Sequence, residues 1–317
     1  VKKQGGETEY LAGAGNRLLM FKDVNTCYDA WELGSMYENM PIPTGEAVSM
    51  AMHAGAYRAA LEINRKIGAS DLTQEIVLTA DAAYIAFVTK IDWQERHKLL
   101  KVAFAVNAHA REAMHEIQFG YVKRPTHRSY QTDKDRYEVC NHRYSDLSES
   151  RYGVAVLNDC KYGISVEGGD MRLTLHKGGC HPDPTNDRGV HDMTWSLLPH
   201  AGAFSAENVV REAHAMNHPP LLHAGKAEIA PICRVDESNI LCDTVKMAED
   251  VENAFVLRLY ECERNRTTAH ITIPTACRVW RTNMLEEKIE ELPMTADHTV
   301  EVSFHPFAIE TLLCERK

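Results

Sequence analysis

From about residue 47 onward, hydrophobic residues recur mostly with a period of two. Successive side chains of a β-strand point to opposite faces, so this period is typical of antiparallel strands with one buried face. The clearest run covers residues 85–93 and is followed by a polar turn at 94–97 and a second run at 100–106. Shorter runs lie at residues 48–52, 61–63, 164–166, 171–175 and 193–197, the last one ending before Pro199. We therefore predict a mainly β chain in which Val48, Met50 and Met52 belong to a buried face.

Two local signals refine this picture. Glu167-Gly168-Gly169-Asp170 separates two apolar runs and predicts a hairpin, because glycine accommodates the positive φ values of a tight turn. The segment 205–217 predicts one short helix that begins at a serine cap and ends at two prolines. Elsewhere strands do not alternate with amphipathic helices, which disfavours a (β/α) barrel or a doubly wound nucleotide-binding sheet.

The chain is long enough for about two domains, with 317 residues. Residues 218–242 are rich in Pro, His, Ala and Gly and show weak periodicity, so we expect a boundary there. Beyond them, runs at 255–259, 271–273, 300–304 and 309–313 predict a small β-sandwich. We expect one large β unit over residues 1–242, of which residues 1–46 are leading strands and a linker, and a small sandwich over 243–317.

Charge and cysteine content narrow the classes of partner. Lys and Arg number 35 against 45 Asp and Glu, a net charge of -10, and no basic stripe is present, which disfavours nucleic acid and anionic membranes. No segment approaches the roughly 20 apolar residues of a spanning helix. The nine cysteines include no CxxC pair and are interpreted as free thiols in the cytoplasm. The chain opens at Val1 without a recognisable targeting segment, as though cut from something longer.

Two polar segments carry candidate chemistry. Residues 181–192 hold two histidines and three aspartates in a loop that two prolines and a glycine keep from being helical. Such a loop would ligate a metal, bond its own backbone, or contact a polar ligand. Residues 157–163 combine an amide, a carboxylate, an ammonium and a phenol, which suit sugar hydroxyls but also occur in strand-end turns. No GxSxG elbow or local signature of a Cys/His nucleophile is present. Glycoside hydrolysis by two carboxylates is chemically possible, because it needs only an acid and a nucleophile at a suitable distance.

Several strings, taken in order, resemble glycoside hydrolase family 38, the α-mannosidases. Residues 91–104 are similar to the family's D-W-x-E-R-H-K-L-L-K-V-x-F strand pair, and residues 182–191 to its P-D-P-x-x-D-x-G-x-H loop. Further matching strings are E-x-Q-F-G at 116–120, R-P-T-H at 124–127, residues 152–163, Asn16-Arg17-Leu18, Asp29-Ala30-Trp31, and segments at 245–249 and 258–261. The resemblance covers essentially the whole chain.

This resemblance implies the C-terminal β-rich half of such an enzyme, a mutarotase-like antiparallel β supersandwich followed by a small C-terminal β-sandwich. In that family the nucleophilic Asp, the acid and the His/Asp zinc ligands lie in an N-terminal α/β barrel, which nothing in this sequence matches. The resemblance thus implies no catalytic residue, metal ligand or bound cofactor in this chain. Zinc or another divalent metal is expected in the missing domain.

Family loops of the β half help to line the sugar site. Carried over residue by residue, the substrate-binding candidates are Asn158, Asp159 and Tyr162 in one loop and Asp187, Arg188, Gly189 and His191 in the other. Arg188 departs from the bacterial-type branch, which tends to have an acidic residue there, whereas an Arg-Gly pair contacts substrate in the Golgi and lysosomal branch. Glu32 also departs from the usual Asp. Loop scaffolding remains the alternative role for these residues.

The expected whole protein is a retaining α-mannosidase that hydrolyses α-linked mannose from mannosides or oligosaccharides, and it is expected to be a homo-oligomer. Its partners are then carbohydrate and its own catalytic domain, and this chain alone is predicted to be inactive. Two alternatives stay open, a mutarotase-like epimerase and a non-catalytic carbohydrate-binding module. A module needs exposed aromatic rings, whereas Trp31, Trp93 and Trp195 lie in strand-like or family strings that favour packing.

Overall fold

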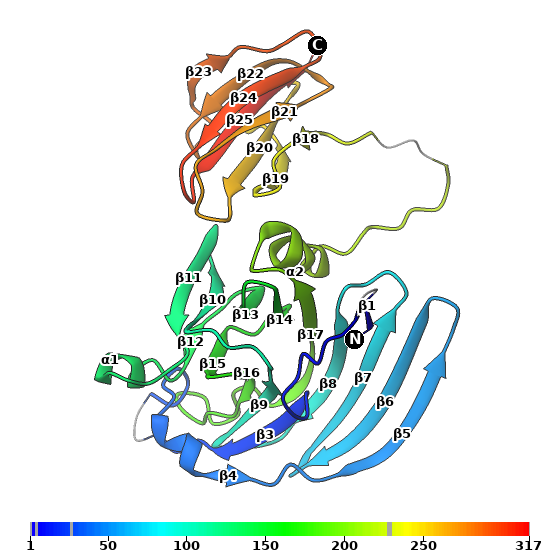
Figure 1. Cartoon of the computed structure of the whole chain (residues 1–317), viewed down its shortest axis with the longest axis vertical. Helices are drawn as coiled ribbons and strands as arrows, with labels where there is room; N and C mark the ends of the chain where they lie inside the picture. Colours follow the sequence, from blue (N-terminus) through cyan, green and yellow to red (C-terminus); the bar gives the residue numbers. More distant parts are fainter. Residues whose placement is uncertain (1, 4–5, 26–27, 227–229, 317) are drawn as a thin grey trace. The chain divides into compact units, whose positions relative to one another are not determined.

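The computed structural model describes residues 2–3, 6–25, 28–226 and 230–316, so Cys27 lies outside the described residues. Two compact units make up this described part (Figure 1). The larger unit comprises Val1–Glu116, Val122–Phe204 and Glu212–His218, and the smaller unit comprises Ile117–Tyr121, Ser205–Arg211 and Pro219–Lys317. The strand pairings recorded for the described residues are antiparallel, and the mainly β fold predicted from the period of two is confirmed.

Among the described residues, the largest sheet has nine strands and the second sheet has six (Figure 1). In spatial order the first consists of β11 (Gly120–Pro125), β10 (Glu112–Ile117), β13 (Tyr144–Ser148), β14 (Tyr152–Asn158), β17 (Gly189–Ala201), β8 (Ile85–Trp93), β7 (Ser70–Thr79), β6 (Arg58–Ile67) and β5 (Ala47–Ala54). The second consists of β12 (Val139–Cys140), β15 (Gly163–Glu167), β16 (Asp170–Lys177), β9 (Lys98–Ala105), β3 (Arg17–Lys22) and β4 (Pro41–Ile42). A short pair, β1 (Lys2–Lys3) and β2 (Gly6–Glu7), precedes them.

The core of the larger unit lies where these two sheets face each other. The ring of Phe87 on β8 lies 5.6 Å from that of Phe104 on β9 and 6.1 Å from that of Trp195 on β17. Burying each such side chain stabilises the fold by about 1.5–3 kcal/mol. The alternation over residues 85–93 is confirmed, because Phe87, Ile91 and Trp93 are buried. The polar turn after Trp93 carries the chain from one sheet to the other, so β8 and β9 are not neighbours.

At the edge of the nine-stranded sheet the predicted burial is wrong. Residues 47–54 form the expected strand β5, but Val48, Met50 and Met52 are 74%, 66% and 77% exposed. Within the described residues β5 is the last strand of its sheet and pairs with β6 alone. A six-stranded layer cannot cover a nine-stranded one completely, so alternation along an outer strand does not specify a buried face.

The predicted hairpin and helix both form. Gly168 and Gly169 join β15 to β16, and Gly168 has a φ of +55°. The helical segment begins with a π-helical turn at Ala206–Val210 and continues as α2 (Arg211–Asn217), and the Ser205 side chain accepts a hydrogen bond from the amide of Asn208 at 3.1 Å. Shorter helices are η1 (Ser35–Asn39), a 3-10 turn, and α1 (Gln131–Lys134). Strand β17 continues through Pro199 to Ala201, beyond the end expected from the sequence.

The smaller unit is the β-sandwich expected at the C-terminal end. Its described strands form a three-stranded sheet of β18 (Arg234–Val235), β21 (Thr267–Thr272) and β24 (Thr299–Phe304), and a five-stranded sheet of β19 (Ile240–Met247), β20 (Ala254–Glu261), β25 (Ile309–Arg316), β22 (Ala276–Thr282) and β23 (Lys288–Leu292). A separate core that includes Phe255, Leu257, Ile271 and Val302 fills it. The sequence pattern missed β23, because that outer strand leaves most of its side chains in solvent.

In the part of the chain that the structure describes, no helix is long and apolar enough to cross a membrane.

Candidate functional site

Two loops that follow strand ends, together with parts of β16 and β17, line an open pocket of about 270 Å³ in the larger unit. The first loop joins β14 to β15, and the second joins β16 to β17. Three of the residues proposed from the sequence, Tyr162, Asp187 and His191, lie together in its wall. The complete lining consists of Cys160, Lys161, Tyr162, Gly163, Thr174, Leu175, His176, Lys177, Asp187 and His191.

The carbonyl group of Asp187 organises the second loop. Nε2 of His176 lies 3.2 Å from this oxygen and Nε2 of His191 lies 2.8 Å from it. A carbonyl oxygen only accepts hydrogen bonds, so both imidazoles carry their hydrogen on Nε2 and donate it. Asp187 adopts a φ of 60°, which turns its carbonyl inward, and the two rings meet edge to face at 4.3 Å. The loop is therefore held by the neighbouring strands.

Burial makes His176 a neutral group. Its surroundings lower the pKa of the imidazole from 6.5 to about 4, chiefly by desolvation, against the opposing effect of the hydrogen bond to Asp187. Trp93 supplies part of this apolar environment, with its ring 4.7 Å from that of His176. At neutral pH the pocket thus combines the neutral imidazole of His176 with the exposed carboxylate of Asp187 and the phenol of Tyr162. Such groups both donate and accept hydrogen bonds, as sugar hydroxyls require.

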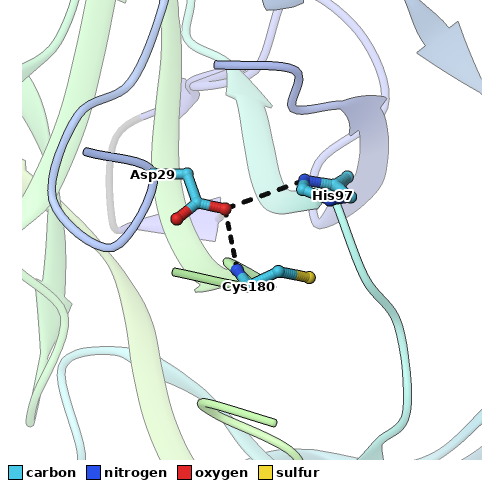
Figure 2. A group of neighbouring side chains, drawn as sticks. All are labelled: Asp29, His97 and Cys180. Carbon is cyan, nitrogen blue, oxygen red and sulfur yellow. Dashed lines mark hydrogen bonds and ion pairs between the residues drawn. The ribbon is translucent and has the colours of Figure 1, made fainter. Parts of the chain in front are cut away.

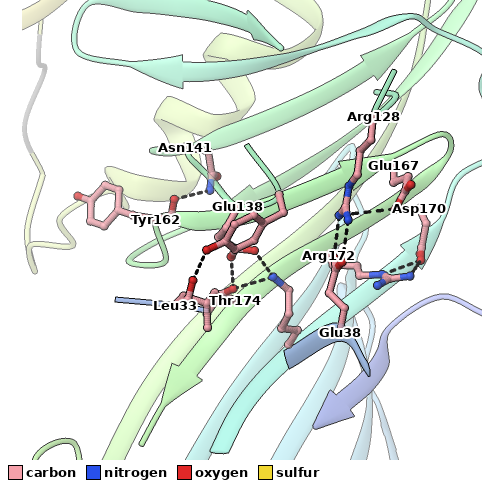
Figure 3. A network of polar contacts seen from close by, with 12 residues as sticks. Leu33, Glu38, Arg128, Glu138, Asn141, Tyr162, Glu167, Asp170, Arg172 and Thr174 are labelled. Atoms are coloured by element: carbon pink, nitrogen blue, oxygen red, sulfur yellow. Dashed lines mark hydrogen bonds and ion pairs between the residues drawn. The ribbon is translucent and has the colours of Figure 1, made fainter. Parts of the chain in front are cut away.

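A network of polar contacts supports the first loop (Figure 3). The backbone amide and the side-chain amide of Asn141 both donate to the carbonyl of Tyr162, at 2.8 and 3.1 Å. Further along, Glu138 binds the Thr174 hydroxyl and the ammonium group of Lys101. Lys101 is completely buried, and this burial lowers the pKa of its ammonium group. Glu138 and Asn141 flank the short strand β12, so the internal ion pair lies beside the residue that holds the first loop.

The other sequence candidates lie elsewhere. Asn158 is buried, and its side-chain amide donates to Asn141 and to the His142 carbonyl while it accepts from the Lys161 amide. Asp159 accepts from the Thr194 amide at 2.9 Å and lines a neighbouring hollow of about 310 Å³.

Arg188 and Asp183 face outward from the second loop. Nη2 of Arg188 donates to Oε1 of Gln94 at 3.2 Å, in the turn after β8. Asp183 accepts hydrogen bonds from the amide and hydroxyl of Thr185, at 2.8 and 2.9 Å. These contacts form a self-contained turn, and the Thr185 amide lowers the pKa of Asp183.

His176 is the pocket residue that the sequence interpretation missed. Strict alternation with Leu173 and Leu175 would place it on the opposite face of β16 from these core residues. The pairing of β16 with β9 shifts register between Thr174 and His176, so the strand is irregular just before this histidine. The two inward-facing leucines gave no sign of that irregularity.

The burial of the tryptophan side chains agrees with the prediction only in part. Trp93 and Trp195 are buried, as expected, but Trp31 is 67% exposed and stacks on Tyr28 with ring centres 5.5 Å apart. The prediction that Trp31 packs inside is wrong. Asp29 turns inward and accepts two backbone hydrogen bonds, which leaves the adjoining aromatic residues on the outside of the turn.

Comparisons with known proteins place the chain in a family. Residues 1–185 match the glycosyl hydrolases family 38 C-terminal domain, and residues 239–312 match the family's C-terminal beta sandwich domain. The chain is 34% identical to human alpha-mannosidase 2C1 over 98% of its own length and 31% of the relative's. It is 33% identical to alpha-mannosidase G of Dictyostelium discoideum, over 94% of this chain and 29% of that protein.

A solved structure shares the fold. The alpha-mannosidase from Enterococcus faecalis V583 superposes with a TM-score of 0.74 at 15% identity, covering 95% of this chain and 38% of that one. The chain thus spans about a third of the length of the relatives that it matches. The matches to both family domains and the 34% identity show that this chain belongs to glycosyl hydrolase family 38 and carries its C-terminal β domains.

Proposed function

We propose that this chain is the C-terminal part of a retaining α-mannosidase that releases α-linked mannose from mannosides or oligosaccharides. In this proposal the Tyr162, Asp187 and His191 pocket lines the sugar site beside a catalytic domain that the chain does not include. The convergence of these three side chains, Tyr162 and Asp187 from two strand-end loops and His191 from β17, carries the proposal. Relatives named alpha-mannosidase support the substrate class.

Binding and orientation are the roles that this geometry favours. Asp187 accepts hydrogen bonds from sugar hydroxyls, and the Tyr162 phenol donates and accepts. His191 directs Nε2 to the Asp187 carbonyl, so its Nδ1 is left for a ligand. Among the lining residues, Asp187 is the one carboxylate, whereas glycoside hydrolysis needs an acid and a nucleophile. The chain's contribution is to hold the sugar in place, which raises the effective molarity of catalytic groups supplied elsewhere.

The metal of the family is expected in the missing domain, as zinc or another divalent ion. Among the described residues, neither His176 nor His191 belongs to a group of three close potential metal ligands, so the pocket is assigned no metal. The sugar-binding role proposed for this pocket does not involve a metal ion.

A cytoplasmic location and a homo-oligomeric state belong to the same proposal. Eight cysteines in the described residues are free thiols, as a reducing compartment would keep them.

Loop variants of the complete protein test the sugar-binding role. We expect Tyr162→Phe and Asp187→Asn to lower kcat/KM for an aryl α-mannoside by at least about tenfold, since each removes a hydrogen-bonding or charged group from the pocket. Tyr57→Phe and Asp81→Asn are matched controls, because both residues are exposed and lie outside the pocket lining. Equal kcat/KM in the pocket variants and the controls would reject the proposed role.

A carbohydrate-binding module remains a second candidate, favoured by the exposed Tyr28 and Trp31 rings. Stacked aromatic rings on a surface suit the apolar face of a sugar. Titration of the chain with mannose oligomers, followed by tryptophan fluorescence, tests it. Saturable quenching that Trp31→Ala abolishes would favour the module, and unchanged fluorescence would count against it.

A further inference from the structure

A group of three potential metal ligands, none of which lines the pocket, lies where three loops meet (Figure 2). Asp29 belongs to a turn near the start of the chain, His97 to the turn between β8 and β9, and Cys180 to the loop after β16. One ligand atom from each residue lies within 4.8 Å of the other two. A carboxylate, an imidazole and a thiol from distant parts of the sequence thus converge.

The spacing of these atoms fits a shared ion better than a hydrogen bond. Oδ2 of Asp29 lies 3.8 Å from Nδ1 of His97, beyond hydrogen-bond range. Tetrahedral zinc, with bonds of about 2.0–2.3 Å, separates its ligand atoms by about 3.4–3.6 Å. A small movement of the exposed His97 ring and the Cys180 thiol is enough to reach this spacing.

Backbone hydrogen bonds hold the group in position. Asp29 is buried, and its two carboxylate oxygens accept from the amides of Cys180 and His181 at 2.8 Å each. His97 has a φ of 50°, and its own amide donates to the carbonyl of Gly178 at 2.6 Å. Metal ligands are commonly oriented by such secondary contacts. Among the described residues, neither the His97 ring nor the Cys180 thiol makes a hydrogen bond, so the ring nitrogens and the sulfur are available to bind a metal.

The charges also suit a divalent cation. The Cys180 amide is the main cause that lowers the pKa of Asp29, so its carboxylate is ionised at neutral pH. A carboxylate and a thiolate together neutralise one divalent ion. Lys177 is the nearby opposing charge, but Asp23 pairs with it. Thiolate and imidazole select zinc over magnesium or calcium, which prefer oxygen ligands.

We propose that Asp29, His97 and Cys180 bind one zinc ion, with water as the fourth ligand. This departs from the sequence expectation that the chain holds no metal ligand. Zinc here would join the turn at Asp29 to the base of the loop that carries Asp187. The proposal is independent of the sugar-binding role.

Zinc titration of the metal-free chain, against a chromophoric chelator, tests the site. We expect one tightly bound equivalent, and at least about tenfold weaker binding for Cys180→Ser and for His97→Asn, which tolerates the positive φ. Cys140→Ser and His53→Asn are matched controls, because both residues are exposed and lie outside the group. Circular dichroism of each variant establishes that it is folded.

Cobalt provides a spectroscopic test of the thiolate ligand. Cobalt(II) bound to the chain should show thiolate-to-metal charge-transfer absorption that Cys180→Ser loses and Cys140→Ser keeps. Absence of stoichiometric zinc binding would overturn the proposal, as would equal affinities in the site variants and the controls. Asp29 and His97 would then form only a long ion pair.

Discussion

At the residue scale, one fully buried lysine side chain has polar partners inside the protein. Lys101 has no solvent exposure and pairs with Glu138, whose side chain keeps 15% exposure. Thr174 completes the group, with its hydroxyl 3.0 Å from the Lys101 ammonium. The desolvation cost of such a pair is offset only while both charges are present. These three side chains therefore link β9, β16 and the residue before β12.

Removing one partner of this ion pair should be costly. We expect Glu138→Gln to lower the free energy of unfolding by about 3 kcal/mol, because it leaves a buried ammonium without a counter-charge. The double variant Lys101→Met/Glu138→Gln should regain a large part of that loss. Urea unfolding of the two variants and the parent chain measures both effects. A single variant as stable as the parent would show that Lys101 reaches solvent.

Two buried histidines should make stability fall in mild acid. Burial lowers the pKa of His115 and of His176 from 6.5 to about 4. The unfolded chain therefore binds more protons than the folded chain between these values, so stability is full above about pH 6.5 and is lost as the pH falls toward 4. The difference corresponds to about 3 kcal/mol for each imidazole.

The measurement is the free energy of urea unfolding between pH 7.5 and 4.5. His115→Gln and His176→Gln should each flatten this dependence, whereas His53→Gln, at an exposed position, should leave it unchanged. An identical pH dependence in all three variants would contradict the assignment.

At the scale of elements, the hairpin between β15 and β16 depends on two glycines with different constraints. Gly168 has a φ of +55° but open space around it, whereas a Cβ on Gly169 would lie 2.3 Å from the carbonyl oxygen of Val106. The amide of Val106 also donates to the Gly169 carbonyl at 2.7 Å. A side chain at position 168 is disfavoured by the positive φ, and a side chain at position 169 is disfavoured by the nearby backbone of Val106.

Alanine substitutions should separate these two constraints. We expect Gly168→Ala to cost about 1 kcal/mol through backbone strain, and Gly169→Ala about 2–3 kcal/mol through a forced shift of the strand and loss of the Val106 contact. Gly168→Asn should cost less than Gly168→Ala, because asparagine tolerates this conformation. Thermal or chemical unfolding ranks the three variants, and the reverse order for the two alanines would refute this explanation.

The sequence predicts strands well where both faces have a defined environment. The alternation at Phe87, Ile91 and Trp93 and the glycine turn at Gly168 are local signals, and the structure confirms them. Met50 shows the limit, because its exposure depends on how far a second sheet extends. That is a tertiary property, and alternation along one strand does not contain it.

The candidate pocket was predictable only in part. Its two loops are visible as polar segments, but His176 enters it next to an irregularity in β16, and Asn158 turns away to bind Asn141. The group of Asp29, His97 and Cys180 has no sequence signature, because its members come from three distant segments. Convergence of loops depends on the fold, so spacing along the chain does not reveal it.

At the scale of the whole molecule, each unit fills its own apolar core. The larger core includes Ile91, Trp93 and Trp195, and the smaller includes Phe255 and Val302. Separate cores are the usual property of domains that fold as units. The candidate pocket belongs to the larger unit, and its described lining holds one carboxylate residue. This composition suits sugar positioning, while the chemical step needs groups beyond the pocket.

The most direct test of this account is hydrolysis of an aryl α-mannoside by the purified 317-residue chain, with and without added zinc, beside complete human alpha-mannosidase 2C1. We predict turnover by the complete relative and none by this chain in either condition. Turnover by the chain alone would contradict the account and would make Asp187 and its neighbours catalytic candidates.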